Sequence, residues 1–204
     1  MVIKDKSRGR LSSPRGRTKI LEALNSLLEK KDFQAITWAE IANTAGVNEA
    51  LIYKYFRNKR NLLHQLLSEI LEGFVEDLTD ELNGSIEGAM NKLRKFVWSH
   101  IHIYNRQRVF AKILVLEVRN YPGYFRSETY QFAKNFGKIL AEIIEEGIQD
   151  AIFRDDIPVW DMRQIILGAI EHICLPNIVY NREMDPTVLT ERIMKSIVEG
   201  IRKK

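Results

Sequence analysis

The run TWAEIANTAGVNEALIYKYFRNK, at residues 37–59, constrains the fold more than any other part of the chain. Thr37 followed three residues later by Glu40 is the pattern of a capping box, which starts a helix. Gly46 then supplies a tight turn, and Asn48 is a good N-cap for a second short helix. Two short helices joined by a glycine-containing turn predict a helix-turn-helix.

The helical wheel of the second helix separates an inner face from an outer face. Ile52 and Phe56 fall on one side and should pack on the preceding helices. Ala50 and Lys54 point the opposite way, and Tyr53 flanks them. A small side chain permits close approach to base edges, while lysine and tyrosine can reach phosphate oxygens. This arrangement favours a surface that binds nucleic acid.

The charge of the chain is concentrated at its N-terminal end. Residues 1–62 hold 13 Lys and Arg against 6 Asp and Glu, whereas the rest holds 18 against 21. Such a basic segment indicates a polyanionic partner, with nucleic acid as the first candidate and an anionic membrane surface as the second. Residues 1–17 have cations but no periodicity, so we expect a flexible basic arm, either solvated or in contact with DNA.

The remaining sequence has the spacing of amphipathic helices. Hydrophobic residues make up 45% of the 204 residues, enough for a sizeable core, and no segment indicates a strand strongly. We therefore predict an all-α fold with helices over 18–31, 38–44, 49–55, 59–82, 86–104, 107–119, 125–150, 159–180 and 186–202.

Several classes of protein are disfavoured by what the sequence contains. Its one cysteine, Cys174, cannot form a disulfide framework, and the four histidines have no metal-ligand spacing. No phosphate-binding loop, nucleophile elbow or carboxylate pair indicates an enzyme, and we expect no metal and no cofactor. The basic N-terminus lacks a following apolar stretch, and no run is long enough to span a membrane, so a cytoplasmic protein without membrane contact is expected.

The segment TWAEIANTAGVNEALIYKYFRNKRNLL resembles the N-terminal DNA-binding domain of the TetR (tetracycline-repressor-like) family of transcriptional regulators. The likeness covers about 50 residues and is specific. Asn48 and Ala50 replace the family's usual Ser and Gly, and Glu49 and Leu51 are less typical. The positions that match in register are Thr37, Ile41, Ala42, Ala45, Gly46, Val47, Tyr53, Tyr55, Phe56, Lys59 and Leu62.

The resemblance implies a three-helix DNA-binding domain over 18–64 and a C-terminal helical bundle over 65–204 for ligand binding and dimerisation. By position, Thr37 and Trp38 are expected at the DNA backbone, and Lys59 at a phosphate. The expected base-reading residues are Asn48, Glu49, Ala50 and Leu51. The expected phosphate or mixed contacts are Tyr53, Lys54 and Tyr55.

The resemblance also implies a homodimer, formed through 159–180 and 186–202, that represses transcription from a palindromic operator. A small lipophilic effector would bind between 86 and 180 and release the DNA. A weaker likeness of EVRNYPGYFRSETY and the segment after it, to regulators that respond to fatty acids or acyl-CoA, suggests such a ligand, with Arg106 and Arg108 near its phosphates. The alternative is a DNA-binding regulator that has no small-molecule effector. Candidate ligand contacts are Trp98, His102, Phe110, Tyr121, Tyr124, Tyr130, Phe136, Glu171 and His172.

Overall fold

The structure is a computed structural model that describes residues 15–202. Within this range the fold is all-α, as predicted, and the only β-type pairing is an isolated bridge between Phe153 and Arg202. The chain divides into two compact units, the first ending at Leu66 and the second beginning at Leu67. The α-helices are α1 (Arg15–Leu28), α2 (Trp38–Ala45), α3 (Glu49–Tyr55), α4 (Lys59–Gly84), α5 (Ala89–Arg106), α6 (Arg108–Lys112), α7 (Glu128–Gln149), α8 (Val159–Val179) and α9 (Pro186–Ile201), and the short helices are η1 (Phe33–Ala35), η2 (Ile113–Val118) and η3 (Tyr124–Arg126).

The first unit is built by α1 packing on α2 and α3, with the first turns of α4 completing its core. Ile20 and Leu24 of α1 are fully buried, as is Ile41 of α2. Ile52 and Phe56 are also fully buried, so the inner face predicted by the helical wheel is confirmed. Burying several large apolar side chains in so few turns is what stabilises these short helices.

The ends of the short helices form as the sequence predicts. The Glu40 backbone amide donates to Thr37 Oγ1 over 3.2 Å, and the Thr37 amide donates to Glu40 Oε2 over 2.8 Å, which completes the capping box. Gly46 ends α2 with a φ of +63°, a left-handed conformation that favours glycine. Asn48 Oδ1 accepts from the Leu51 amide over 2.9 Å at the start of α3. These bonds fix the turn between α2 and α3.

Two features at the beginning of the first unit differ from the prediction. Helix α1 begins at Arg15, so residues 15–17 are helical and do not belong to a flexible arm. Residues 1–14, the rest of the predicted arm, lie outside the described residues. The short helix η1 between α1 and α2 was not predicted, because three residues are too few to show a hydrophobic period.

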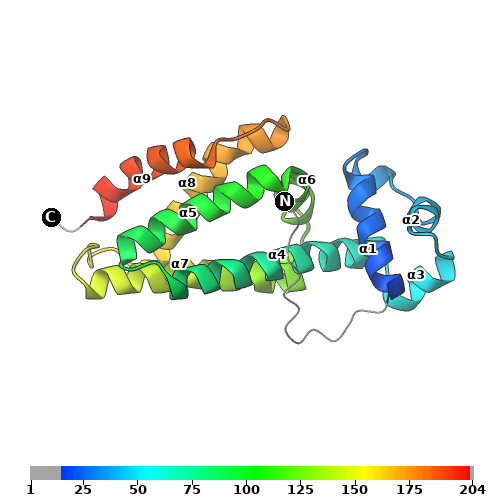
Figure 1. The fold of residues 1–204 in the computed structure, drawn as a ribbon, viewed down its shortest axis with the longest axis horizontal. Coiled ribbons are helices and arrows are strands. Elements are labelled where there is room, and N and C mark those ends of the chain that lie inside the picture. The colour runs from blue at the N-terminus through cyan, green and yellow to red at the C-terminus, as the bar shows by residue number, and fades with distance from the viewer. Residues whose placement is uncertain (1–14, 203–204) are drawn as a thin grey trace. The chain divides into compact units, whose positions relative to one another are not determined.

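The second unit is a bundle in which α5 packs against α7, α8 and α9. Figure 1 shows α5, in green, running alongside α9, in red. Leu93, Phe96 and Val97 of α5 are fully buried at this centre, and Leu140 of α7 is buried with them. Near the C-terminal end of α7, Gly147 leaves room for the ring of buried Phe153, because an added Cβ would lie only 2.1 Å from that ring.

The helix predicted over 107–119 is divided in the structure. It begins as α6 and continues as η2, which is a π-helix and so has a wider turn than an α-helix. Hydrophobic spacing could not reveal this change, because five or six residues of apolar sequence fit either helix type. π-Helical turns occur frequently at functional sites, and η2 contributes Leu114 and Val115 to the cavity described below.

Candidate nucleic-acid interface and internal cavity

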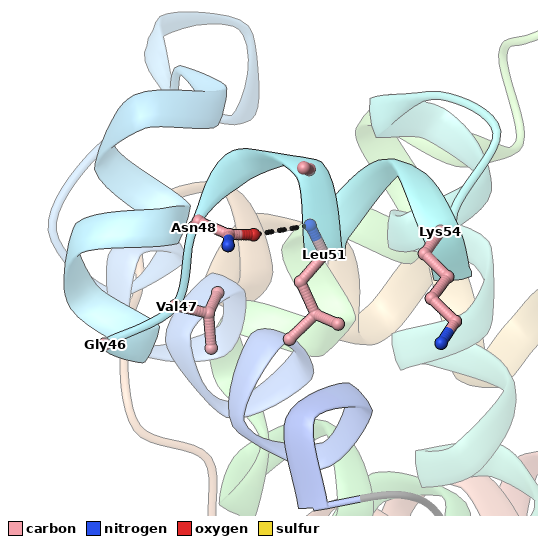
Figure 2. A pocket seen from close by; sticks show the side chains of 6 residues that line it. Gly46, Val47, Asn48, Leu51 and Lys54 are labelled. Carbon is pink, nitrogen blue, oxygen red and sulfur yellow. Dashed lines mark hydrogen bonds between the residues drawn. The ribbon is translucent and has the colours of Figure 1, made fainter.

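The outer face of α3 and the turn before it form a shallow hollow on the first unit. Figure 2 shows the side chains of Val47, Leu51 and Lys54 extending from the same side of this region. Ala50 and Lys54 are exposed, in agreement with the helical wheel. Asn48 is exposed too, and because its cap uses only Oδ1, its amide nitrogen stays available as a donor. The lining residues are Gly46, Val47, Asn48, Ala50, Leu51 and Lys54.

Two aromatic side chains meet at one end of this face. Tyr53 is 55% exposed, and its ring lies 5.4 Å from that of Trp38, centre to centre. This contact joins the start of α2 to the middle of α3. Tyr55 is less exposed than Tyr53, because it is half-buried and packs edge-on against Phe56. The exposed phenol of Tyr53 is therefore the better placed of the two tyrosines to reach a DNA phosphate.

Leu51, expected at a base-reading position, is partly used in packing. It is half-buried, and a Cβ built on Gly16 would lie 2.9 Å from Leu51 Cδ2 and 3.6 Å from Tyr55 Cε2. Glycine at position 16 therefore lets α1 lie close beside α3. The structure gives Leu51 a role in holding α1 against α3, which its unusual identity at this position did not reveal.

The carboxylate of Glu40 is neutralised within the first unit. A hydrogen bond from Lys31 is the main cause of its low pKa, which is about 2, and the capping bonds from the Thr37 amide and hydroxyl add to it. Glu40 therefore stays ionised but paired. The Thr37 hydroxyl also donates to this carboxylate over 3.0 Å, so its proton is already engaged inside the protein.

Lys59 is held inside the first unit, although it was expected at a phosphate. Its ammonium donates to the backbone carbonyls of Phe33, Gln34 and Ile36 over 3.0, 3.2 and 2.8 Å. It also lies 4.8 Å from the centre of the Phe33 ring. Burial, and to a lesser degree the charge of Arg60, lower the pKa of Lys59. All three donors are used, so we assign Lys59 a structural role as the tie between η1 and the start of α4.

A cavity of about 1020 Å³ lies within the second unit. Its volume is at the upper end of the roughly 300–1,000 Å³ usual for small-molecule sites. Its wall comes from α4 through η3, α7 and α8, and most of the lining side chains are aliphatic or aromatic. The aromatic members are Phe74, Tyr104, Phe110, Tyr124, Phe125, Tyr130, Phe136 and Trp160.

The structure places six of the nine predicted ligand contacts on the lining of this cavity and three away from it. Trp98 and His102 lie on the side of α5 away from the cavity, where their rings stack 4.5 Å apart. Both lie two residues from His100, a lining position of the same helix, which turns them toward the opposite face from it. Tyr121 is exposed and lies against Gly123. The predicted residues that do line the cavity are Phe110, Tyr124, Tyr130, Phe136, Glu171 and His172.

Buried polar residues of the cavity were missed from the sequence. His100 and Tyr104 of α5 are 8% and 5% exposed. At a more exposed part of the lining, Arg119, which was not among the predicted contacts, pairs with the predicted Glu171. Burial, and then the charge of Arg119, lower the pKa of His100 to about 3. Burial raises the pKa of Tyr104, and Glu171 raises it further. Both side chains are therefore neutral near pH 7.

The cations of the cavity are also not the ones expected. Arg106 and Arg108 do not line it, and Arg108 instead pairs with Glu183 over 3.5 Å. Besides Arg119, three cations lie on its lining, the exposed Lys134 and Lys138 on α7 and the half-buried Arg163 on α8. The Arg163 guanidinium stacks 4.1 Å from the centre of the Trp160 ring, and its side chain lies beside Gly137. The cavity thus combines an apolar interior with cations at its exposed edge.

Comparison with known proteins matches each of the two units to a family model. The family model "Bacterial regulatory proteins, tetR family" matches residues 20–66, and "YsiA-like protein, C-terminal region", a TetR-family C-terminal domain, matches residues 67–200. The chain belongs to the TetR family. It is a DNA-binding transcriptional regulator, since the TetR-family relatives compared with it are regulators of this kind.

Three relatives of this TetR-family chain cover nearly its whole length. The fatty acid metabolism regulator protein of Bacillus subtilis (strain 168) is 25% identical over 185 residues, which are 91% of this chain and 95% of that protein. The crystal structure of FadR from Bacillus subtilis in complex with stearoyl-CoA aligns over 91% of this chain and 99% of that one, with a TM-score of 0.81 and 25% identity. FadR from Bacillus halodurans shares the fold, with a TM-score of 0.83 at 22% identity over 96% and 100% of the two chains.

Residues 15–202, the part of the chain that the structure describes, lack two kinds of feature. No helix among them has both the length and the apolar content to cross a membrane. The same residues contain no group of three or more side chains placed to hold a metal ion.

Proposed function

We propose that this TetR-family protein binds a palindromic operator as a homodimer and is released from it by a long-chain fatty acid or acyl-CoA held in the cavity of the second unit. The observation that carries the proposal is the cavity itself, which pairs a large apolar interior with cations at its exposed edge. The likeness to a Bacillus subtilis FadR determined with stearoyl-CoA supports the same ligand class.

The DNA-binding part of the proposal rests on the outer face of α3. Asn48, Glu49 and Ala50 are exposed where bases would be read, and Lys54 is placed to contact phosphate. Tyr53, supported by Trp38, extends this surface. Thr37 keeps its place at the N-terminus of α2, where backbone amides favour a phosphate.

The effector part rests on chemistry that suits an acyl-CoA. Apolar and aromatic walls bury a hydrocarbon chain at about 25 cal/mol per Å² of surface removed from water. Lys134, Lys138 and Arg163 would neutralise phosphates of the CoA moiety at the exposed edge. Trp160 is 60% exposed beside Arg163, which makes it suitable for stacking on an adenine ring.

The effector would act through α4, which is one continuous helix. Leu71 and Phe74 of α4 line the cavity, and Leu62 and Leu63 near its start are fully buried in the first unit. A ligand that prefers one position of α4 would shift the population of dimers away from the spacing that fits the operator.

The homodimer is supported by apolar residues that α8 leaves exposed. Ile166 and Ile170 are fully buried in the second unit, whereas Ile165 is 58% exposed and Ile173 is 38% exposed. On α9, by contrast, Ile193, Ile197 and Ile201 are buried. Exposed large apolar groups on one helix are typical of a subunit interface.

The experiment that tests this function measures binding to labelled duplex DNA from upstream of the protein's own gene, with and without palmitoyl-CoA. We expect tight, salt-dependent binding that micromolar palmitoyl-CoA reverses and free CoA does not. Lys54→Ala is the control for the DNA surface, and sedimentation of Ile165→Glu tests the dimer. Specific DNA binding that no fatty acid or acyl-CoA alters would instead indicate a regulator without this effector.

A further inference from the structure

One polar side chain in the cavity wall has no partner for a buried nitrogen. His100 is 92% buried, and its Nδ1 has no hydrogen-bond partner among the described residues. Its ring is enclosed by those of Phe96, Tyr104 and Phe136, whose centres lie 6.3, 4.7 and 4.9 Å away. Buried polar atoms are nearly always hydrogen-bonded, so an unpaired one in a residue that lines a cavity indicates a missing partner.

Four other polar side chains of the same wall gather near His100. We call this set the polar cluster, and it consists of His100, Tyr104, Arg119, Tyr124 and Glu171. Arg119 is hydrogen-bonded to Glu171, and Tyr104 stacks edge-on against His100. The charges of Arg119 and Glu171 affect the pKa of both Tyr104 and Tyr124. The five side chains therefore form one group, although they come from α5, η3, α8 and the end of η2.

The polar cluster has no net charge to offer a ligand. Arg119 and Glu171 cancel one another, and the two tyrosines are neutral. The buried imidazole of His100 is neutral as well, so it presents one donor and one acceptor. A carboxylate placed here would face Glu171 with no free cation beside it. A plain hydrocarbon would leave the nitrogen of His100 without a partner.

We propose that the polar cluster recognises a neutral oxygen-bearing group of the effector, a carbonyl or a hydroxyl, within the otherwise apolar cavity. This inference rests on the proposed function and narrows its ligand class. An imidazole can donate to a carbonyl or accept from a hydroxyl, and the Tyr104 hydroxyl can do either. The group has two sources, the thioester carbonyl of an acyl-CoA or an oxygen substituent on the acyl chain.

The test compares three ligands that differ in their oxygen atoms. Palmitoyl-CoA has the thioester carbonyl, S-hexadecyl-CoA replaces it with a thioether, and 3-hydroxypalmitoyl-CoA adds a hydroxyl to the chain. Affinities for the full-length protein are measured by calorimetry. If the carbonyl is recognised, palmitoyl-CoA binds about tenfold more tightly than the thioether. If a chain oxygen is recognised, the hydroxylated compound binds about tenfold more tightly than both others.

The variants separate recognition from general effects on the cavity. His100→Phe should remove the preference while retaining binding, because phenylalanine suits its aromatic surroundings. Tyr104→Phe, which deletes one hydroxyl only, should weaken the preference. The matched control is His102→Phe, the same change on the same helix, which should leave the preference intact because His102 stacks on Trp98 outside the cavity.

The outcomes distinguish this inference from the proposed function. Equal binding of the three ligands by the unaltered protein, or a preference that survives in His100→Phe, would overturn the role of the polar cluster and leave the acyl-CoA effector standing. Failure of all three to bind would overturn an acyl-CoA effector and this inference together.

Discussion

The turns of the first unit and the cavity wall of the second unit use their polar side chains differently. In the first unit, the polar groups that shape the turns have partners in the chain: Lys59 binds three carbonyls, and Thr37 and Glu40 bind each other. In the second unit, the cavity wall holds His100 Nδ1 and Arg163 Nε without hydrogen-bond partners among the described residues. The first set of groups stabilises a fixed surface, and the second is available to a ligand.

This difference matches what the two regions have to do. A surface that reads DNA gains from being fixed before binding, since ordering side chains at the moment of contact costs affinity. A ligand cavity that controls the protein gains from unsatisfied groups, because the ligand then stabilises the state in which they are paired.

Ile52→Asp should unfold the first unit. Ile52 is fully buried, so the change places an unpaired carboxylate in an apolar core, at a cost of more than about 4 kcal/mol. DNA binding should be abolished and the protection of α1–α3 amides from hydrogen exchange should be lost, while the second unit keeps its protection. DNA binding by this variant at wild-type strength would mean that Ile52 does not face the core.

Lys59→Met should destabilise the first unit by about 1–3 kcal/mol, because three backbone carbonyls lose a common donor. Methionine is unbranched and apolar and keeps most of the length of the side chain, and the melting temperature of the first unit reports the loss. The salt dependence of DNA binding should be unchanged, since we assign Lys59 no phosphate contact. A weaker salt dependence of DNA binding together with unchanged stability would indicate that Lys59 contacts a DNA phosphate.

Lys54→Ala should show the opposite pattern. Lys54 is exposed on the outer face of α3, so its removal should leave the melting temperature unchanged. DNA affinity should fall for specific and competitor sequences alike, and the slope of log K against log salt should decrease in magnitude by about 1. An unchanged slope would show that Lys54 makes no phosphate contact. The roles of Lys54 and Lys59 would then differ less than we expect.

His100→Phe should have little effect on stability near pH 8, because no hydrogen bond to Nδ1 is lost. The pKa of His100 is about 3 in the folded chain and about 6.5 when unfolded, so the unfolded state takes up the proton first as the pH falls. The wild type therefore loses stability below pH 6.5, by about 2 kcal/mol at pH 5. The variant lacks this loss and should melt at a higher temperature than the wild type at pH 5. Equal pH dependence of the two proteins would show that His100 is not buried and neutral.

Where the sequence was accurate, the signals were local. The range predicted for α3 matches the structure, and the caps at Thr37 and Asn48 form as expected. Each cap joins groups three residues apart, so the sequence contains both partners side by side. The prediction for Lys59 did not agree with its observed contacts, because those contacts join residues that are far apart in the sequence. Its carbonyl partners lie 23 to 26 residues away, in the short helix η1 and just after it, which no period reveals.

The cavity depended on long-range packing. Phe110, Tyr124, Tyr130 and Phe136 could be proposed because large aromatic residues often line ligand sites, but the same reasoning selected Trp98, which faces away. Arg119 and Glu171 are 52 residues apart, and their pairing depends on how η2 packs near α8. Similarly, Ile165 and Ile166 are alike in sequence, and only the packed bundle buries one and exposes the other.

The sequence by itself therefore determined an all-α chain with a capped helix-turn-helix whose outer face is small, basic and aromatic. Hydrophobic period and capping act over three or four residues, so they can be read along the chain. The tertiary structure decided which polar groups remain without partners in the cavity wall, beginning with His100. That outcome depends on the burial of each atom by several helices at once, and burial is a property of the packed bundle.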